Sequence, residues 1–102
     1  MSPTPKVPYT VDELILALDF YLTHGSPPRQ ETREQFVALM RLMHPHSAKS
    51  VEAQLRNFAS LDSGPGLSNA STWAEWVWAE LGENPERCRE MADKIRKRAG
   101  SA

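Results

Sequence analysis

The chain has 102 residues, of which 40% are hydrophobic and 25% charged, and this is the composition of one small globular domain. Its formal net charge is −1, so the overall charge does not indicate a nucleic-acid partner. The single cysteine, Cys88, excludes an intrachain disulfide and a cysteine-based zinc cluster. No apolar run approaches the roughly 20 residues of a membrane span, and no secretory signal is visible, so we expect a cytoplasmic protein.

The charges are unevenly distributed along the chain. Residues 29–58 carry five bases against three acids, and the residues from Pro85 onward carry six bases against three acids. Between these two segments, residues 59–84 carry four acids and no base. The near-neutral total therefore conceals two mildly basic segments around an acidic one, although most such segments are only solvated faces.

The first predicted elements are an arm and a helix. Residues 1–8 contain three prolines and are expected to form a flexible arm. A helix is predicted over "TVDELILALDFYLTHG", because Thr10 and Glu13 have the spacing of a capping box and Gly25 is a natural stop. The apolar stripe of this helix consists of Leu14, Leu18, Tyr21 and Leu22.

A second helix is predicted over "ETREQFVALMRLMHP". Thr32 and Gln35 again have capping-box spacing, and Pro45 ends the helix. The predicted buried stripe consists of Phe36, Leu39, Met40 and Met43.

The third helix is predicted from about Ser50 to Leu61. Either Ser47 or Ser50 can cap its N-terminus. With the second helix and the short polar turn before it, it has the order of a helix-turn-helix motif. Its inner face consists of Val51, Leu55 and Phe58.

Two further helices follow the segment "DSGPGLSNAS", which has the composition of a loop. The fourth begins at "STWAE", where Thr72 and Glu75 repeat the capping-box spacing, and ends at Gly82. We expect Trp73, Trp76 and Val77 to face inward and leave the burial of Trp78 open. The fifth is predicted over "NPERCREMADKIRKRAG", with Asn84 as N-cap and a narrow inner edge made by Met91 and Ile95 with Cys88 or Ala92.

These patterns predict an all-α fold of about five short helices in one compact domain, since no alternating strand pattern is present. The predicted boundaries are the flexible arm over residues 1–8, a single helical domain over residues 9–99 and a C-terminal tail over residues 100–102.

Catalytic and metal-binding motifs are missing from the sequence. His44 and His46 lie two residues apart across a helix end with no third ligand nearby, so we predict no metal site. Cys88 has no evident catalytic partner, and "DSGPGLS" lacks the glycine spacing of a phosphate-binding loop. We therefore expect no enzyme activity and no cofactor in this chain.

The outer face of the third helix carries more information. At about 100° per residue, the side chains opposite the apolar stripe include Lys49, Ala53, Arg56 and Asn57. Arginine can bridge guanine O6 and N7, asparagine or glutamine can pair with adenine, and small residues allow a helix to enter a groove closely. The alternative is an ordinary amphipathic helix whose outer side is polar because it is solvated.

Three ordered blocks favour the DNA-binding interpretation. The blocks "YTVDELILALDFYL", "SVEAQLRNFASLD" and "GLSNASTWAEWVWAELGENPERCREMADKI" resemble the N-terminal domain of HNH-type, modification-dependent (type IV) restriction endonucleases. The resemblance spans roughly residues 9–96 and is strongest in "LRNFASLD". Tyr9 departs from it, because the family tends to have tryptophan there, and Gln54 and Arg56 stand near positions often held by lysine and another residue.

The resemblance implies a DNA-binding module that recognises methylated or otherwise modified duplex DNA in a restriction system for phage defence. The expected partners are double-stranded DNA, hemimethylated DNA included, and the C-terminal reader and nuclease domains of a longer HNH endonuclease. The chain ends at Ala102 ahead of such domains, so we expect either one domain of a longer protein or a stand-alone relative, associated with the nucleoid in a prokaryote. The candidate DNA-binding residues are Arg41, Ser47, Lys49, Ser50, Ala53, Gln54, Arg56 and Asn57.

A protein–protein docking or dimerisation module of the same restriction system is the alternative function. Trp76 and Trp78, with the acidic stretch around them, would form its surface, because exposed tryptophan is a good interface anchor. The solvent exposure of Trp78 distinguishes the two functions, since a fully buried Trp78 would remove the best anchor. A homodimer remains open in either case.

Overall fold

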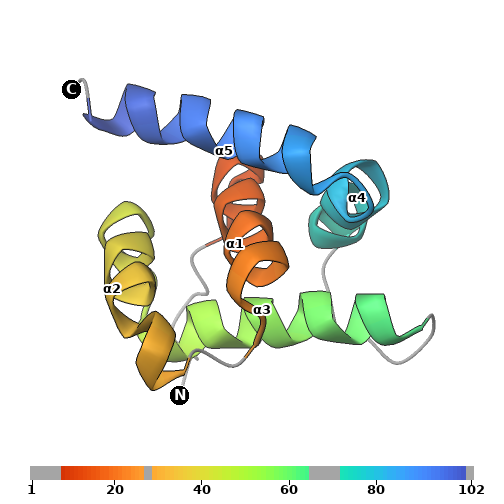
Figure 1. Cartoon of the computed structure of the whole chain (residues 1–102), viewed down its shortest axis with the longest axis horizontal. Coiled ribbons are helices and arrows are strands. Elements are labelled where there is room, and N and C mark those ends of the chain that lie inside the picture. The colour runs from red at the N-terminus through yellow and green to blue at the C-terminus, as the bar shows by residue number, and fades with distance from the viewer. Residues whose placement is uncertain (1–7, 27–28, 65–71, 101–102) are drawn as a thin grey trace, which may run out of the picture.

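Helix α1 (Val11–His24) lies at the centre of the molecule, with the other helices packed around it (Figure 1). The computed structural model describes residues 8–26, 29–64 and 72–100. The surrounding elements are the 3₁₀ helix η1 (Gln30–Thr32), α2 (Arg33–Leu42), α3 (Ala48–Ser63), α4 (Thr72–Leu81) and α5 (Pro85–Gly100). The described residues contain no strand, which confirms the all-α class.

The described helices form one compact globule. The radius of gyration is 13.3 Å, close to the roughly 13 Å expected of a single domain of 100 residues. Most of the predicted arm, residues 65–71 of the predicted loop and the last two residues of the predicted tail lie outside the described residues. None of the described helices is long and apolar enough to cross a lipid bilayer.

The predicted ends of α1 are confirmed. Thr10 Oγ1 accepts a hydrogen bond from Glu13 N at 3.1 Å, and Glu13 Oε1 accepts one from Thr10 N at 2.8 Å, which completes the capping box. After His24 the backbone turns at Gly25, whose φ of 83° lies in the region that favours glycine.

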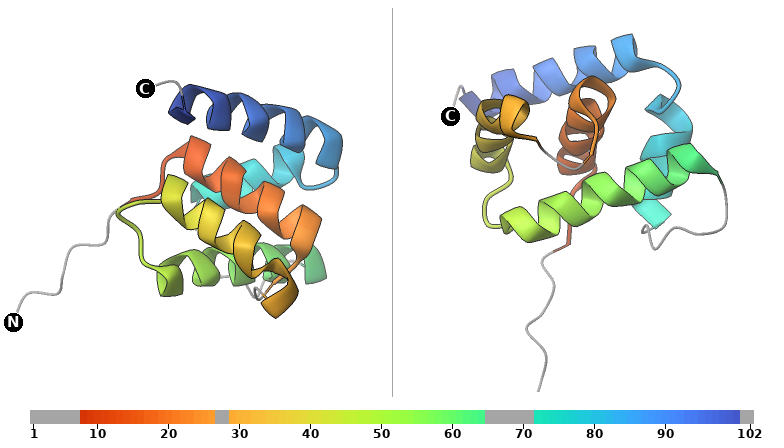
Figure 2. Two further views of the ribbon diagram at one scale, coloured as in Figure 1. Left: turned by 60° about the vertical axis from the view of Figure 1, so that its left-hand side comes forward. Right: turned by 60° about the horizontal axis from the view of Figure 1, so that its bottom comes forward.

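Burial along α1 differs from the single stripe that we predicted. Every residue from Leu14 to Phe20 is buried, because α3, α4 and α5 each pack against α1 and cover different sides of it (Figure 2). The contiguous apolar run "LILAL" has no polar side, and a helix that is apolar all round belongs in the centre of a fold. Tyr21 and Leu22, which we placed on the stripe, are only half-buried.

The capping box predicted for α2 is wrong. Thr32 is the last residue of η1, with φ −107° and ψ 11°, and it lacks the extended backbone from which an N-cap side chain reaches forward to Gln35. Its hydroxyl oxygen instead accepts a hydrogen bond from Arg29 N at 2.9 Å. Of the predicted stripe of α2, the buried members are Leu39 and Met43.

Helix α3 is longer than predicted and has the predicted inner face. It runs from Ala48 to Ser63, and Val51, Leu55 and Phe58 are fully buried. A short turn over residues 43–47 joins it to α2, and α2 and α3 each pack mainly against α1 rather than against each other. The helix-turn-helix-like arrangement of these two helices therefore stays a prediction.

The orientation that we predicted for α4 is confirmed for Val77 and wrong for Trp73 and Trp76. Trp73 and Trp76 are exposed, while the buried side chains are Ala74, Val77 and Leu81. The small Ala74 is fully buried on the helix that packs against α1, and the indole of the half-buried Trp78 packs beside Phe58 and Tyr21. Ala74 and Val77 lie on one side of α4, and Trp73 and Trp76 lie on another. Burial of the first pair therefore turns the two tryptophans toward solvent.

The predicted start of α5 is confirmed. Asn84 Oδ1 accepts a hydrogen bond from Arg87 N at 3.3 Å, and Pro85 is the first helical residue. The buried side chains of α5 are Cys88, Ala92 and Ile95, so both residues that we left open belong to the inner edge, while Met91 is half-buried.

Candidate nucleic-acid interface

The candidate interface is the outer side of α3. Helices α3 and α5 lie on opposite sides of α1 (Figures 1 and 2), so the outer side of α3 faces away from the rest of the fold. Seven of the eight residues predicted to bind DNA lie on α3 or at its N-cap, and the eighth, Arg41, lies on α2.

The N-terminus of α3 is capped by Ser47 rather than Ser50. Ser47 has extended backbone, with φ −79° and ψ 159°, and its side chain accepts a hydrogen bond from Ser50 N at 3.1 Å. The Ser50 hydroxyl in turn forms a 2.7 Å hydrogen bond with the Tyr9 hydroxyl. These bonds leave the backbone N–H groups of Ala48 and Lys49 as the donors that point out of the helix end.

A small cluster beneath this end holds α3 against the start of α1. The His46 imidazole is buried and stacks on the Tyr9 ring, with centroids 3.8 Å apart and planes 5° from parallel. Its Nε2 lies 3.3 Å from Glu13 Oε1, on the same side chain that closes the capping box of α1. Burial raises the pKa of the Tyr9 phenol; the Ser50 hydrogen bond lowers it in part, and the Glu13 carboxylate adds to the increase.

The two histidines of "HPH" do not converge. His44 is exposed, whereas His46 points into the cluster with Tyr9. Among the described residues, no group of three or more His, Cys, Asp or Glu side chains is placed to hold a metal ion.

A second tyrosine ties the far end of α3 to α1. The Tyr21 hydroxyl donates a 2.7 Å hydrogen bond to Asp62 Oδ2. Burial, together with the hydrogen bond to Asp62 and its negative charge, raises the pKa of Tyr21 to about 12. Helix α3 is thus anchored at both ends, and its orientation relative to the core is fixed.

The predicted DNA-binding residues fall into two groups by exposure. The exposed ones are Arg41, Ser47, Lys49 and Arg56. The half-buried ones are Ser50, Ala53, Gln54 and Asn57.

Lys49, Ala53 and Arg56 follow one line along α3, spaced by four and three residues. On one side of this line, Asn57 Nδ2 donates a 3.5 Å hydrogen bond to Gln54 Oε1. No described residue forms an ion pair with Lys49 or Arg56, so both charges are available to a ligand.

Sequence reasoning missed several side chains that shape the surface or position it. Asp19 is buried in the middle of α1, where a carboxylate inside an apolar run was a signal of a buried ion pair. His46 was considered as a metal ligand or as part of a helix end and loop, and its burial against Tyr9 was not predicted. The outward direction of Trp73 was also missed, although the small Ala74 beside it was a visible candidate for the buried position.

Comparison with protein-family models, with curated proteins and with solved structures found no match to this chain. The resemblance to type IV HNH restriction endonucleases therefore stays a prediction from the sequence blocks. The geometry of α3 is the structural support that remains for a nucleic-acid interface.

Proposed function

We propose that this chain is a DNA-binding module that lays the outer side of α3 against duplex DNA, as part of a type IV HNH restriction system. The observation that carries the proposal is the line formed by Lys49, Ala53 and Arg56 on a helix anchored at both ends. A rigid helix with its charged side chains unpaired can meet DNA without first breaking internal contacts.

The chemistry along this line suits a groove. Ala53 lies between Lys49 and Arg56. Its small side chain lets the helix axis come close to the floor of the major groove, which is about 12 Å wide in B-form DNA. Arg56 can bridge the O6 and N7 atoms of guanine, and Lys49, in the first turn of α3, can bind a phosphate.

The neighbouring amides add a second recognition element. The bond from Asn57 to Gln54 leaves the Asn57 oxygen and the Gln54 amino group free to bond elsewhere. An amide pair of this kind can present an acceptor and a donor side by side, which matches the N6 and N7 edge of adenine. Gln54 and Asn57 are therefore assigned to base contact.

The N-terminus of α3 supports a phosphate contact. The Ser47 hydroxyl and the N–H groups of Ala48 and Lys49 lie together at the positive end of the helix dipole. Ser50 is assigned a different role, because its hydroxyl is bonded to Tyr9 and holds the helix in place. Arg41, exposed on α2, is assigned to the flanking backbone.

The preference for modified DNA rests on the family resemblance alone. Contact with a cytosine methyl group needs an apolar side chain at the interface, and Ala53 is the small apolar residue on the line. The class of modification is therefore left to a binding screen.

The proposal is tested by mobility-shift titration with four matched duplexes: unmodified, hemimethylated, fully methylated and phosphorothioate. We expect binding that weakens steeply with salt, and Lys49→Ala should lower the slope of log K against log salt by about 0.9, the value for one phosphate contact. Arg56→Ala with Asn57→Ala should weaken binding by about 1–3 kcal/mol for each base-edge interaction that the substitutions remove.

The matched control is Arg87→Ala with Lys94→Ala, which removes exposed bases on α5, on the opposite side of the molecule. This variant should bind each duplex like the original chain. A salt-independent titration, or equal losses of affinity in the α3 and α5 variants, would contradict the placement on α3.

A further inference from the structure

An aromatic surface on α4 is unexplained by the proposed DNA contact. Trp73 is 58% exposed and Trp76 49% exposed, and their rings meet edge to face with centroids 6.2 Å apart. Glu80 lies seven residues from Trp73 and four from Trp76, so it continues the same side of the helix. We call Trp73, Trp76 and Glu80 the aromatic face.

The aromatic face is acidic as well as apolar. Helix α4 contains Glu75 and Glu80 and no lysine or arginine, and the exposed Glu83 follows in the next turn. Two exposed tryptophans side by side form a patch of the kind that proteins use as interface anchors. A partner for this face should therefore combine apolar and cationic groups.

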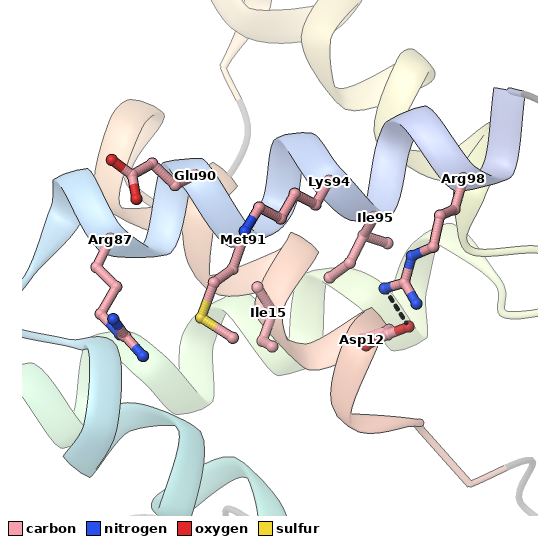
Figure 3. A pocket seen from close by; sticks show the side chains of 8 residues that line it. All are labelled: Asp12, Ile15, Arg87, Glu90, Met91, Lys94, Ile95 and Arg98. Atoms are coloured by element: carbon pink, nitrogen blue, oxygen red, sulfur yellow. Dashed lines mark hydrogen bonds and ion pairs between the residues drawn. The ribbon is translucent and has the colours of Figure 1, made fainter.

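Apolar and cationic side chains gather in a pocket between α1 and α5. The pocket has a volume of about 260 Å³ (Figure 3). Its apolar part is formed by Ile15, Met91 and Ile95. Its charged edge is formed by Arg87, Glu90, Lys94, Arg98 and Asp12.

The side chains of the charged edge that remain available to a partner are basic. Arg98 is paired with Asp12 at 3.3 Å, whereas no described residue forms an ion pair with Arg87 or Lys94. Glu90 turns away from Ile15 and the apolar part in Figure 3. The volume lies below the roughly 300–1,000 Å³ of typical small-molecule sites, and it suits a single large side chain better than a cofactor.

The contents of the pocket suit an indole ring. Aliphatic side chains pack on its face, the thioether of Met91 makes favourable contacts with aromatic rings, and Arg87 and Lys94 can lie over its π-system. Arg87 and Lys94 are seven residues apart on α5, and Trp73 and Glu80 are seven residues apart on α4. Both pairs therefore span about 10 Å along their helices. The two residues of the α4 pair can then contact the two residues of the α5 pair at the same time.

We propose that this chain associates with a second copy of itself, the aromatic face of α4 in one copy docking into the pocket between α1 and α5 in the other. One indole fills the pocket, and Glu80 lies against Arg87 or Lys94. The two surfaces differ, so a single contact between two copies is heterologous. If each copy docks its aromatic face into the pocket of the other, the result is a two-fold dimer; if only one contact forms between each pair of copies, the result is an open linear assembly. The association is independent of the proposed DNA contact, which uses α3.

The association should be weak. Two partly exposed tryptophans contribute less than the roughly 150–250 Å² that each such side chain can bury, which places the contact in the class of small, transient interfaces. We expect the weight-average mass of the 102-residue chain in sedimentation equilibrium to rise with concentration toward the millimolar range.

The decisive experiment mixes two variants that each lack one surface. The first, Trp73→Ala with Trp76→Ala, keeps the pocket, and the second, Arg87→Glu with Lys94→Glu, keeps the aromatic face. All four side chains are exposed, so both variants should retain the helical circular dichroism of the original. Each variant alone should remain monomeric, while an equal mixture should regain association through the one intact pair of surfaces.

The control is Arg29→Glu with Arg33→Glu, an equal charge reversal at exposed positions outside the pocket, and it should associate like the original. A monomeric original chain at millimolar concentration would overturn the proposal. So would self-association of the pocket variant alone, which would mean that the tryptophans stack on each other. A mixture that stays monomeric while the original associates would also overturn it.

Discussion

Helix α1 is joined to α5 and to α3 by different kinds of polar contact. On the α5 side, the buried carboxylate of Asp19 pairs with Arg89 Nε at 2.9 Å and with Arg96 at 2.5 Å. On the α3 side, the polar contacts lie at the two ends: Tyr9 with Ser50 and His46 with Glu13 at one end, and Tyr21 with Asp62 at the other, while the middle is apolar. An ion pair thus sits at the centre of one contact, and the polar groups of the other contact sit at its ends.

These two kinds of contact leave different freedom to the outer sides of α5 and α3. The α5 contact depends on ions that are partly desolvated, so removing a partner there leaves charge unmatched. The α3 contact is mostly apolar packing, with hydroxyl bonds that orient the helix at little electrostatic cost. The outer side of α3 can therefore be charged or changed without disturbing how the helix is held.

The largest effect should come from the apolar middle of the α3 contact. Phe58 is fully buried, with its ring 6.4 Å from that of Trp78, and Phe58→Ala should lower the free energy of unfolding by about 3–5 kcal/mol. Denaturant unfolding followed by circular dichroism measures this decrease. Val37→Ala, at a 44% exposed apolar position, is the control and should change it by less than about 0.5 kcal/mol.

The next effect tests the charged contact on the α5 side. Asp19→Ala removes the acceptor shared by Arg89 and Arg96 and should cost about 2–3 kcal/mol, less than a fully buried pair because both arginines remain partly solvated. Asp12→Ala, which breaks the exposed pair with Arg98, should cost under about 1 kcal/mol. Equal losses of stability in the two variants would mean that the burial of Asp19 carries no extra energy.

A smaller effect should appear at the hydroxyl contacts. Tyr21→Phe deletes the hydrogen bond to Asp62 and should cost about 1 kcal/mol at neutral pH. The pKa of Tyr21 is raised to about 12 in the folded chain from an ordinary value of 10.0, so its stabilisation is complete below pH 10 and is lost as the pH rises toward 12. Tyr21→Phe should remove that part of the alkaline destabilisation.

Ultraviolet absorbance of tyrosinate checks the same point directly. Both tyrosines of the chain, Tyr9 and Tyr21, should ionise above their ordinary pKa in the folded chain and return to it in denaturant. A folded chain that titrates like the denatured one would show that the two phenol groups are not buried as the structure places them.

The last prediction concerns the chemical reactivity of Cys88 rather than the stability of the chain. Its thiol is buried beside α1, and burial, with the nearby charge of Asp19, raises its pKa to about 12. Iodoacetamide should therefore modify the folded chain far more slowly than the unfolded chain, because the thiolate is the nucleophile. Asp19→Ala should speed this modification more than Tyr21→Phe does, because it removes both a charge that raises the pKa of Cys88 and the ion pairs on the α5 side. Equal rates in the two variants would contradict this expectation.

Local signals in the sequence predicted the helices well where the chain makes its own caps. Thr10 with Glu13 and Asn84 with Pro85 specify two helix starts through bonds within four residues, and both are present. The box at Thr32 failed because η1 precedes α2 and changes the backbone of the capping residue.

What the sequence could not provide was the side of each helix that the fold covers. Apolar periodicity treats α1 as a helix with one inward stripe, whereas contacts on several sides bury it all round. For α4, hydrophobicity favoured Trp73 inside, but the buried residue is its small neighbour Ala74. The exposure of Lys49 and Arg56 was predictable, whereas the engagement of Ser50 with Tyr9 was not, since the two are 41 residues apart.

The two tyrosine bonds also set the register of α3. Tyr9 to Ser50 and Tyr21 to Asp62 are both separations of 41 residues, so the bonds form together in one alignment of α3 along α1. If α3 were shifted by one turn, it would still present apolar side chains to α1, because the apolar residues of its inner face recur about every turn. The hydroxyl bonds exist in one alignment only, and they therefore discriminate against shifted packings that hydrophobic contact alone would tolerate.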